Sequence, residues 1–462
     1  MSRRFCSEHP VTLNRKIWAK LLRPFTKVHP EETALVALMS LTAFLLLTAY
    51  YLLKTVREPL ILLQGGAEVK LYARAGQALA MAVFVHFYAQ LARRVGRAKL
   101  LRFVFLFFIS NLVLFTILAQ ANVQIGLPFF VWVGVFSYTI VAQFWALAAD
   151  IYDREQGKRL FPLIGAGSSI GAVVGGLVAR AIVPLGVPAL MGSAVLLLVV
   201  CAALIGVVEQ RARATGPHDL ETVEAPILAR APWRQLSRDR YLWLIAGMVI
   251  LLNWVNSSGE YLLDRTLLAA AKAAVGTAPQ TFIGVFKADY YVWYNAIGLA
   301  LQLLLVSRVL AVFGVRFALS CLPAFALFGY SAAFIVPTLA VIRMVKIGEN
   351  SLQYSLQETT RHALFLVGSR DEKFVGKTAV DTVAVRMGAI LSALAVYAGS
   401  RLSWSTTTFA AINVVLALGW IAFVVGISRE HRRRELRLAP ANPSTDGGAL
   451  LTAPQPSSCS TG

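Results

Sequence analysis

Cations inside long apolar stretches are the first residues of this sequence that could do chemistry. Lys54 and Arg57 lie three residues apart on one face of a predicted helix, and Arg343, Lys346 and Asn350 form a second stripe at i, i+3 and i+7. A charged group inside a membrane span costs about 2.5 to 3.5 kcal/mol on insertion scales, so retained charges point to function. Both stripes are predicted to bind the phosphate or carboxylate of an anion.

Each stripe also has a structural interpretation. The first could lie at the outer membrane interface, where Pro59 is expected to end its helix. In the second, Arg343 or Lys346 could form an ion pair with Glu349. In the functional interpretation, one stripe lies in each half of the chain, and the cations of the two stripes face each other where the halves meet.

A polar face on the predicted helix over residues 240–264 is the next candidate. Asn253, Asn256 and Glu260 recur at i, i+3 and i+7, and Asp264 follows one turn later. Such a face is not expected to contact lipid. Glu260 could pair with a cation of the other half as a gate, or carry a coupling proton. Hydrogen bonding between helices of the same half is the structural alternative.

Mixed charges gather where two predicted helices leave the membrane. The first group spans residues 150–159 and includes Glu155, and the second includes Arg361, Lys377 and Asp381. These groups could latch the two halves together, or they could form solvated loops. A further segment, residues 287–294, combines Lys287 and Asp289 with four aromatic residues, and this composition favours an interfacial aromatic belt.

No pattern of an enzyme or a metal centre occurs in the sequence. It contains no HExxH motif, no CxxC pair and no Ser/His/Asp set, and its six histidines are scattered. Gly167, Gly171 and Gly175 are spaced by four, which predicts a small-residue seam between membrane helices. They do not form a phosphate-binding loop, because no Gly-Lys-Ser/Thr follows them. We therefore expect no catalytic residue, metal or cofactor.

The composition places these residues in a membrane. The 462 residues are 57% hydrophobic and 15% charged, with a mean hydropathy of +0.64. Apolar stretches recur, each long enough to cross a hydrocarbon core about 30 Å thick as a helix. We predict an all-α polytopic membrane protein with about twelve transmembrane helices. They are expected near residues 33–56, 69–93, 98–120, 123–148, 160–184, 187–208, 240–264, 286–310, 315–334, 335–357, 376–399 and 403–428.

The domain organisation follows from these spans. We expect a basic cytoplasmic tail over residues 1–32, six-helix bundles over 33–208 and 240–428, a cytoplasmic linker over 209–239, and a basic, then disordered, tail over 429–462. Most of the net charge of +20 lies in short connections, which indicates topology rather than binding of nucleic acid. The basic turn after the second span predicts that both termini are cytoplasmic in a bacterial inner membrane.

The two halves of the chain also resemble each other. The basic turn at residues 91–97, after the second span, has a counterpart at residues 307–316, after the eighth. Two parallel six-helix repeats with such a turn are similar to the major facilitator fold, in which substrate binds near the membrane midplane between the halves.

Three segments resemble the nucleotide translocases of plastids and obligate intracellular bacteria, the ATP/ADP translocase family. Residues 52–62 match its first-helix pattern Leu-Arg-Asp/Asn-x-Lys-Asp-x-Leu-Val-Val, with Lys54 on the arginine, Arg57 on the lysine and Glu58 on the aspartate. Residues 158–165, Lys-Arg-Leu-Phe-Pro-Leu-Ile-Gly, resemble its Lys-Arg-Phe-Tyr-Pro-Leu-Phe-Gly run. Residues 354–361 and 376–381 resemble Tyr-Ser-Leu-Phe-Asp-Pro-Thr-Lys and Gly-Lys-Ala-Ala-Val-Asp, with Arg361 in place of the lysine.

This resemblance implies a nucleotide transporter of the ATP:ADP antiporter type that works by alternating access and is not an enzyme. Its expected partners are a nucleotide or another anionic small molecule and membrane lipid. The residues expected to bind substrate are Lys54, Arg57, Arg343, Lys346, Asn350 and Arg361, and those expected to act in transport or gating are Glu155, Asn253, Asn256, Glu260, Lys377 and Asp381. Two alternatives remain open: a proton- or ion-coupled transporter of another organic anion, and a membrane anchoring or receptor subunit without transport.

Overall fold

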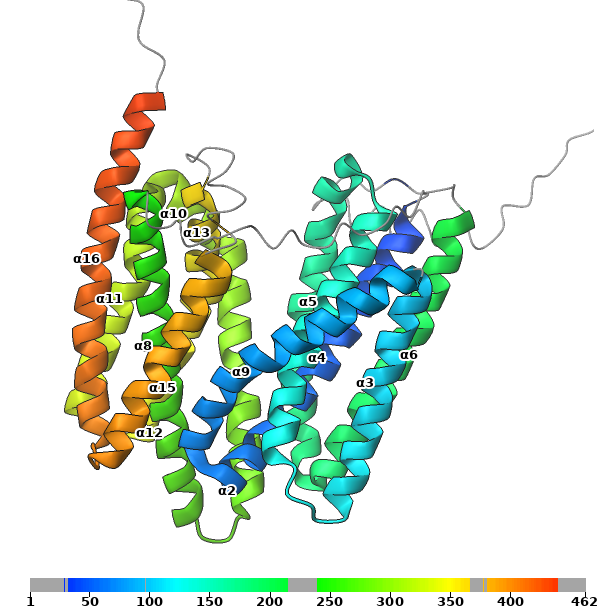
Figure 1. Ribbon diagram of the computed structural model, residues 1–462, viewed down its shortest axis with the longest axis horizontal. Coiled ribbons are helices and arrows are strands. Elements are labelled where there is room, and N and C mark those ends of the chain that lie inside the picture. Colours follow the sequence, from blue (N-terminus) through cyan, green and yellow to red (C-terminus); the bar gives the residue numbers. More distant parts are fainter. Residues whose placement is uncertain are drawn as a thin grey trace, which may run out of the picture.

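The computed structural model describes residues 29, 32–95, 97–214, 239–365, 377 and 380–438. These residues form helices joined by short turns, and no β-strand occurs among them (Figure 1). The expected N-terminal tail, linker and C-terminal tail fall largely outside this part of the chain.

Two groups of helices follow each other along the sequence. The first group consists of α2 (Thr33–Arg94), α3 (Arg97–Gln120), α4 (Gly126–Ile151), α5 (Arg154–Ile182) and α6 (Val187–Ala214), with a 3-10 turn at Val183–Leu185. The second consists of α8 (Arg240–Ala273), α9 (Pro279–Leu304), α10 (Val306–Val312), α11 (Gly314–Ile335), α12 (Leu339–Leu352), the π-helical turn η2 (Gln353–Gln357), α13 (Glu358–Leu364), the π-helical turn η5 (Val380–Ala384), α15 (Val385–Arg401) and α16 (Thr406–Leu438).

The number of membrane passages agrees with the sequence prediction. Among the described residues, nine helical segments are long and apolar enough to cross a membrane. One of them, α2, reverses its direction at Gly66 and provides two passages (Figure 1). The run α12–η2–α13 and helix α9 are not among these segments but extend across the same layer in Figure 1, so the prediction of about twelve transmembrane helices is confirmed.

The prediction that the first helix ends near Pro59 is wrong. The helix continues through Pro59, and the chain turns at Gly66, whose φ of 77° is a left-handed value that favours glycine. Proline is tolerated inside membrane helices because packed neighbours and nearby side chains satisfy the freed backbone groups. Lys54 and Arg57 therefore lie within the helix rather than at a membrane interface.

Each group of helices forms a bundle with its own hydrophobic core. One core cluster joins buried side chains of α2 to α6, and the other joins mainly those of α8, α9, α11, α12, α15 and α16. The bundles meet where α2 and α5 pack against α9 and where α2 also contacts α8 and α15. In Figure 1 the second limb of α2 runs diagonally from the lower end of the second bundle across the first.

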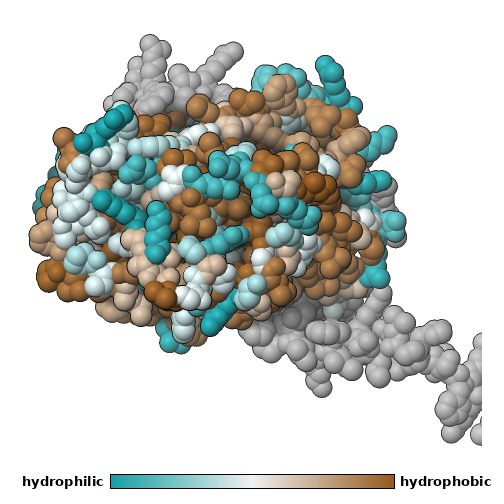
Figure 2. Space-filling view, turned by 90° about the horizontal axis from the view of Figure 1, so that it is seen from below, coloured by the Kyte–Doolittle hydropathy of each residue, from teal (hydrophilic) through white to brown (hydrophobic). Residues whose placement is uncertain are grey.

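The outer surface is that of a membrane protein. Large apolar side chains such as Leu106, Leu303 and Phe328 are exposed on it. Figure 2 views the lower end of Figure 1, where hydrophilic side chains gather among hydrophobic ones. The chain is thus a multi-pass membrane protein, as its composition predicts.

The glycine seam predicted on α5 is confirmed. A Cβ added to Gly167 would lie 2.6 Å from the carbonyl oxygen of Ser40, and one added to Gly171 would lie 2.3 Å from that of Phe44. At Gly175 the added atom would lie 2.9 Å from the Cα of Thr48. Backbones approach this closely because the residues of α5 at the contact are glycines, which have no side chain to keep the helices apart.

We expect Gly171→Ala to destabilise the protein, because the new methyl group would force α5 away from α2. A comparable overpacking substitution costs about 1–3 kcal/mol. The measurement is the thermal unfolding midpoint of the purified protein in detergent. Gly165→Ala is the control, because a Cβ at Gly165 on the same helix would have no atom within 4 Å. Equal midpoints for the two variants would contradict the prediction.

Candidate functional site

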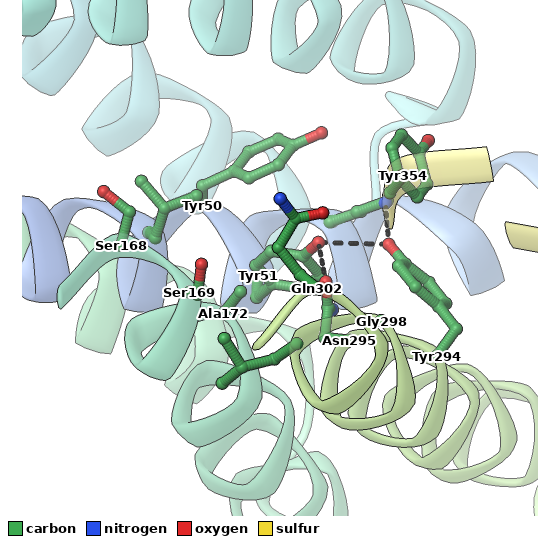
Figure 3. A pocket seen from close by; sticks show the side chains of 13 residues that line it. Tyr50, Tyr51, Ser168, Ser169, Ala172, Tyr294, Asn295, Gly298, Gln302 and Tyr354 are labelled. Atoms are coloured by element: carbon green, nitrogen blue, oxygen red, sulfur yellow. Dashed lines mark hydrogen bonds between the residues drawn. The ribbon is translucent and has the colours of Figure 1, made fainter. Parts of the chain in front are cut away.

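A cavity of about 370 Å³ lies between the two bundles (Figure 3). The first bundle contributes residues of α2 and α5, and the second contributes residues of α9 and η2. Its lining residues are Leu47, Tyr50, Tyr51, Lys54, Ser168, Ser169, Ala172, Tyr294, Asn295, Gly298, Leu299, Gln302 and Tyr354. A volume of this size is typical of small-molecule sites, which often lie where two structural units meet.

Lys54 is the cation of this cavity, and tyrosines surround it. Its Nζ donates a hydrogen bond to the hydroxyl of Tyr294 at 2.8 Å, and it lies 4.5 Å and 5.1 Å from the ring centroids of Tyr291 and Tyr51. No carboxylate oxygen of the described residues lies within 4 Å of it. Cation–π contacts stabilise the ammonium group but leave its charge uncompensated.

The tyrosines are held in place by one another. The hydroxyl of Tyr51 lies 3.0 Å from that of Tyr294 and 3.0 Å from Oδ1 of Asn295. The ring of Tyr354 stacks on that of Tyr294 with a centroid distance of 5.9 Å (Figure 3). The hydrogen bonds join α2 of one bundle to α9 of the other, and the stacked rings join α9 to η2. The cavity therefore combines one cation, aromatic faces and amide groups, which suits an aromatic ring that bears an anionic group.

A buried cluster of charges also joins the two bundles. We call it the inter-bundle cluster: Arg57, Glu58 and Lys70 come from α2, Glu260 and Asp264 from α8, and Lys287 from α9. Lys287 Nζ lies 2.6 Å from Asp264 Oδ1, 3.0 Å from Glu260 Oε1 and 3.6 Å from Glu58 Oε2.

Lys70 completes the cluster from the first bundle. Its Nζ lies 2.6 Å from Asp264 Oδ2 and 3.4 Å from Glu260 Oε1, and it also forms an ion pair with Glu58. Arg57 Nε donates to Glu58 Oε1 at 3.1 Å, and its guanidinium group lies 4.7 Å from the ring centroid of Phe130.

The inter-bundle cluster is electrically balanced, because three cations face three carboxylates. Taking a charge out of water costs several kcal/mol, and a partner within hydrogen-bond distance offsets this cost. The oxygens of Glu58, Glu260 and Asp264 lie within 4.8 Å of one another, close enough to hold a metal ion. However, the ammonium groups of Lys70 and Lys287 lie among them and would repel a cation. The arrangement is that of an ion-pair network.

A second polar network lies inside the second bundle. Lys346 Nζ lies 2.9 Å from Glu349 Oε2, which also accepts a hydrogen bond from the hydroxyl of Tyr330 at 2.7 Å. Asn256 donates to Asn350 at 3.0 Å and to Gln353 at 2.8 Å. The ion pair with Glu349, considered from the sequence as the structural alternative for this stripe, is present.

The two predicted cationic stripes do not face each other across a cavity. Lys346 and Arg57 are each paired with a carboxylate, whereas Lys54 is not. The guanidinium group of Arg343 lies 4.9 Å from the ring centroid of Phe286, and Arg343 does not line the central cavity. Asn350 contacts the hydroxyl of Tyr290, and this hydroxyl lies 3.5 Å from Glu260 Oε2.

The remaining predicted site residues lie away from the cavity. Arg361 pairs with Asp381 at 2.8 Å and with Glu358 at 2.6 Å, so this contact joins two parts of the second bundle and does not latch the halves together. Glu155 and Lys158 form an exposed pair at the start of α5. Asn253 donates to the backbone oxygen of Val249 in its own helix. Lys377 is half-buried, and its neighbours in the sequence lie outside the described part of the chain.

The sequence reasoning missed Lys70 and misread the segment around Lys287. Lys287, Tyr290 and Tyr294 are buried, so the aromatic-belt interpretation is wrong for them, although Trp293 is 56% exposed. The signal was the helical spacing, because Lys287, Tyr290, Tyr291 and Tyr294 share one face and Trp293 lies on another. Lys70 is the second residue of the span predicted over 69–93, and a charge so close to the end of a span is not by itself a signal of function.

Sequence comparisons relate the chain to known transporters. Residues 13–125 match the family model described as TLC ATP/ADP transporter. Over 505 aligned residues the chain is 22% identical to ADP,ATP carrier protein 5 of Rickettsia felis, and the match covers 91% of this chain and 99% of the carrier. These two matches confirm the resemblance to the ATP/ADP translocase family.

Solved structures of transporters share the fold. The POT family transporter PepTSo matches with a TM-score of 0.61 at 11% identity, over 86% of this chain and 99% of its own. A bacterial homologue of the iron transporter ferroportin in an inward-facing state matches with a TM-score of 0.60 at 13% identity. This match covers 84% of this chain and 98% of the homologue. The nucleoside transporter NupG matches with a TM-score of 0.57 at 10% identity, and the match covers 86% of this chain and 98% of NupG. The predicted major-facilitator-like fold is confirmed.

Proposed function

Because the chain is related to the ATP/ADP transporter family, we propose that it is a nucleotide transporter that exchanges ATP- and ADP-type nucleotides across a membrane by alternating access. The observation that carries this proposal is Lys54, an uncompensated ammonium group inside a tyrosine-lined cavity between two bundles. The proposal assigns no chemical conversion to the protein.

The geometry of the cavity indicates how a nucleotide would bind. Phosphate oxygens would accept hydrogen bonds from Lys54, and charge-assisted bonds of this kind are about twice as strong as neutral ones. The exposed ring of Tyr354 and the half-buried ring of Tyr50 lie on opposite bundles and offer faces for a base (Figure 3). Asn295 and Gln302 supply amide groups within reach of the same space.

The inter-bundle cluster is the proposed gate at one end of the cavity. It lies further along the first limb of α2 than Lys54 does, toward the turn at Gly66 and the lower end of Figure 1. Opening this end would separate Lys70 from Glu260 and Asp264, and Lys287 from Glu58. Separating buried charges is costly.

This cost gives a physical reason for exchange. Without substrate, the carrier would have to break the cluster with nothing to replace the lost contacts. A bound polyanion provides new partners for the cations, so the loaded carrier should switch faster than the empty one. In this proposal Arg57, Lys346 and Arg361 act through the carboxylates with which they are paired. Glu260 is the gate residue between the bundles.

The topology is part of the proposal. Basic turns on one side of the membrane favour a bacterial inner membrane with both termini and the linker of residues 209–239 in the cytoplasm. The cavity would then be closed on the outer side by the inter-bundle cluster. Residues 33–208 and 240–428 would be the two moving units.

The test is uptake of labelled ATP by proteoliposomes preloaded with ADP, with inorganic phosphate or with buffer alone. We expect uptake only into vesicles that contain exchangeable nucleotide. Uptake that ignores the internal nucleotide but follows a pH gradient would instead favour an ion-coupled carrier, with Glu260 as the proton-carrying group. No uptake of labelled ATP under any of the three conditions would refute the proposed exchange.

A further inference from the structure

A second cavity lies beyond the inter-bundle cluster. It has a volume of about 360 Å³ and lies between the turn of α2 and the last part of α8. Its lining residues are Gly65, Gly66, Ala67, Glu68, Tyr261, Arg265, Leu268, Ala269 and Lys272. None of them belongs to the central cavity.

The residues of α2 and α9 show that the two cavities lie in line. Along the first limb of α2, Lys54 lines the central cavity, Glu58 belongs to the cluster, and Gly65 lines the second cavity. At about 1.5 Å per helical residue, Lys54 and Gly65 are about 16 Å apart along the axis. On α9 the central cavity lies at Tyr294 and the cluster at Lys287.

A small void connects the cluster to the second cavity. It measures about 10 Å³, and its lining includes the cluster residues Lys70, Glu260 and Asp264 together with Arg74. It shares Ala67 and Tyr261 with the second cavity. A void of this size holds about one water molecule. Central cavity, cluster, void and second cavity thus follow one another along a single path between the bundles.

The second cavity has the chemistry of an anion site. Neither Arg265 nor Lys272 has a carboxylate oxygen within 4 Å among the residues that the structure describes. Arg265 Nη1 donates to the backbone oxygen of Trp404 at 2.9 Å, which holds the guanidinium group at the cavity wall. Guanidinium groups bind phosphate through several N–H donors. Glu68 is the one acidic group in the lining, so the two cations outweigh it.

We propose that the second cavity is a peripheral binding site for the phosphate groups of the substrate, at the end of the pathway opposite to the central cavity. This inference rests on the proposed nucleotide transport. Substrate would bind to Arg265 and Lys272 first, while the inter-bundle cluster is closed. The void beside Lys70 then marks the route by which it reaches Lys54 when the cluster opens.

The test compares transport from the two faces of the membrane. Uptake of labelled ADP by intact cells samples one face, and uptake by inverted membrane vesicles samples the other. With Arg265→Gln and Lys272→Gln combined, we expect KM to rise about fivefold in intact cells, because charges at the rim of a site act mainly on the capture of the ligand. We expect the rate at saturation in intact cells and KM in inverted vesicles to stay unchanged.

The matched control removes the same charge at the other end of the bundle. Arg308 and Arg316 are exposed on α10 and α11 and line neither cavity, so Arg308→Gln with Arg316→Gln should leave KM in intact cells unchanged. If the double variant does not reach the membrane, Lys272→Gln alone replaces it, because this side chain is exposed.

The outcomes separate the two proposals. An unchanged KM on both faces, or an equal rise on both, would overturn the peripheral site while wild-type exchange still supports the proposed function. A rise in KM that is confined to inverted vesicles would support the peripheral site but would reverse the proposed orientation of the protein in the membrane. A wild-type protein that exchanges no nucleotide would overturn the proposed function, and with it this inference.

Discussion

Lys287→Met is expected to lower the free energy of unfolding by about 3–5 kcal/mol, the typical cost of removing one partner from a buried ion pair. Lys287 is fully buried, and its ammonium group lies within 3.0 Å of both Glu260 and Asp264. Without it, the two buried carboxylates of Glu58 and Asp264 and the partly buried one of Glu260 would face only two cations. The same variant should lose nucleotide exchange, because the gate would lack one of its charges. The measurement is thermal unfolding of the purified protein in detergent.

A second-site change distinguishes charge imbalance from lost packing. Lys287→Met combined with Asp264→Asn restores the balance of the inter-bundle cluster and should recover much of the lost stability. The control is Lys158→Met, because Lys158 forms an ion pair with Glu155 in which the side chains are 63% and 79% exposed. Such pairs contribute about 0–1 kcal/mol. A midpoint of Lys287→Met that equals that of Lys158→Met would contradict the assignment of the cluster as a buried network.

Lys54→Met is expected to behave in the opposite way, with loss of binding and little loss of stability. Its ammonium group has no carboxylate partner among the described residues, so its removal leaves no orphaned charge. A hydrogen bond to a charged group contributes about 1.5–3 kcal/mol, so Kd for ADP should rise about 10- to 100-fold. Binding can be measured by calorimetry on the purified protein, and exchange by the proteoliposome assay.

The conservative variant sharpens this test. Lys54→Arg keeps the positive charge but changes a compact ammonium group into a planar fork, so it should retain part of the affinity. Tyr294 would still offer its hydroxyl as an acceptor. A Lys54→Met protein that binds ADP as tightly as the wild type would remove Lys54 from the site and leave the cavity without its assigned cation.

The contrast between Lys54 and Lys287 corrects a simple interpretation of intramembrane cations. From the sequence, Lys54, Arg57, Arg343, Lys346 and Arg361 were the cations expected to bind substrate. The structure pairs Arg57, Lys70, Lys287, Lys346 and Arg361 with carboxylates. The cations that hold the protein together are therefore distinct from the one that is available to an anion in the central cavity. Stability and affinity measurements on matched variants separate the two roles.

The class of protein and much of its architecture follow from the amino-acid sequence. Long apolar stretches cannot stay in water, so composition alone indicated a membrane protein with about twelve helices. The spacing of Gly167, Gly171 and Gly175 identified the face of α5 that packs against α2. The motifs at residues 52–62, 158–165 and 354–361 indicated the transporter family before any geometry was known.

Which charges are partners depends on how the helices pack in three dimensions. Helical periodicity shows that Glu260 and Asp264 share a face, but it does not reveal what faces them. Lys70 and Asp264 are 194 residues apart, and they meet because α2 turns at Gly66 and brings its second limb against α8. Whether a buried lysine binds substrate or closes a gate depends on the carboxylates within a few ångströms of it. That distance is set by the packing of two bundles, and no local pattern in the sequence contains it.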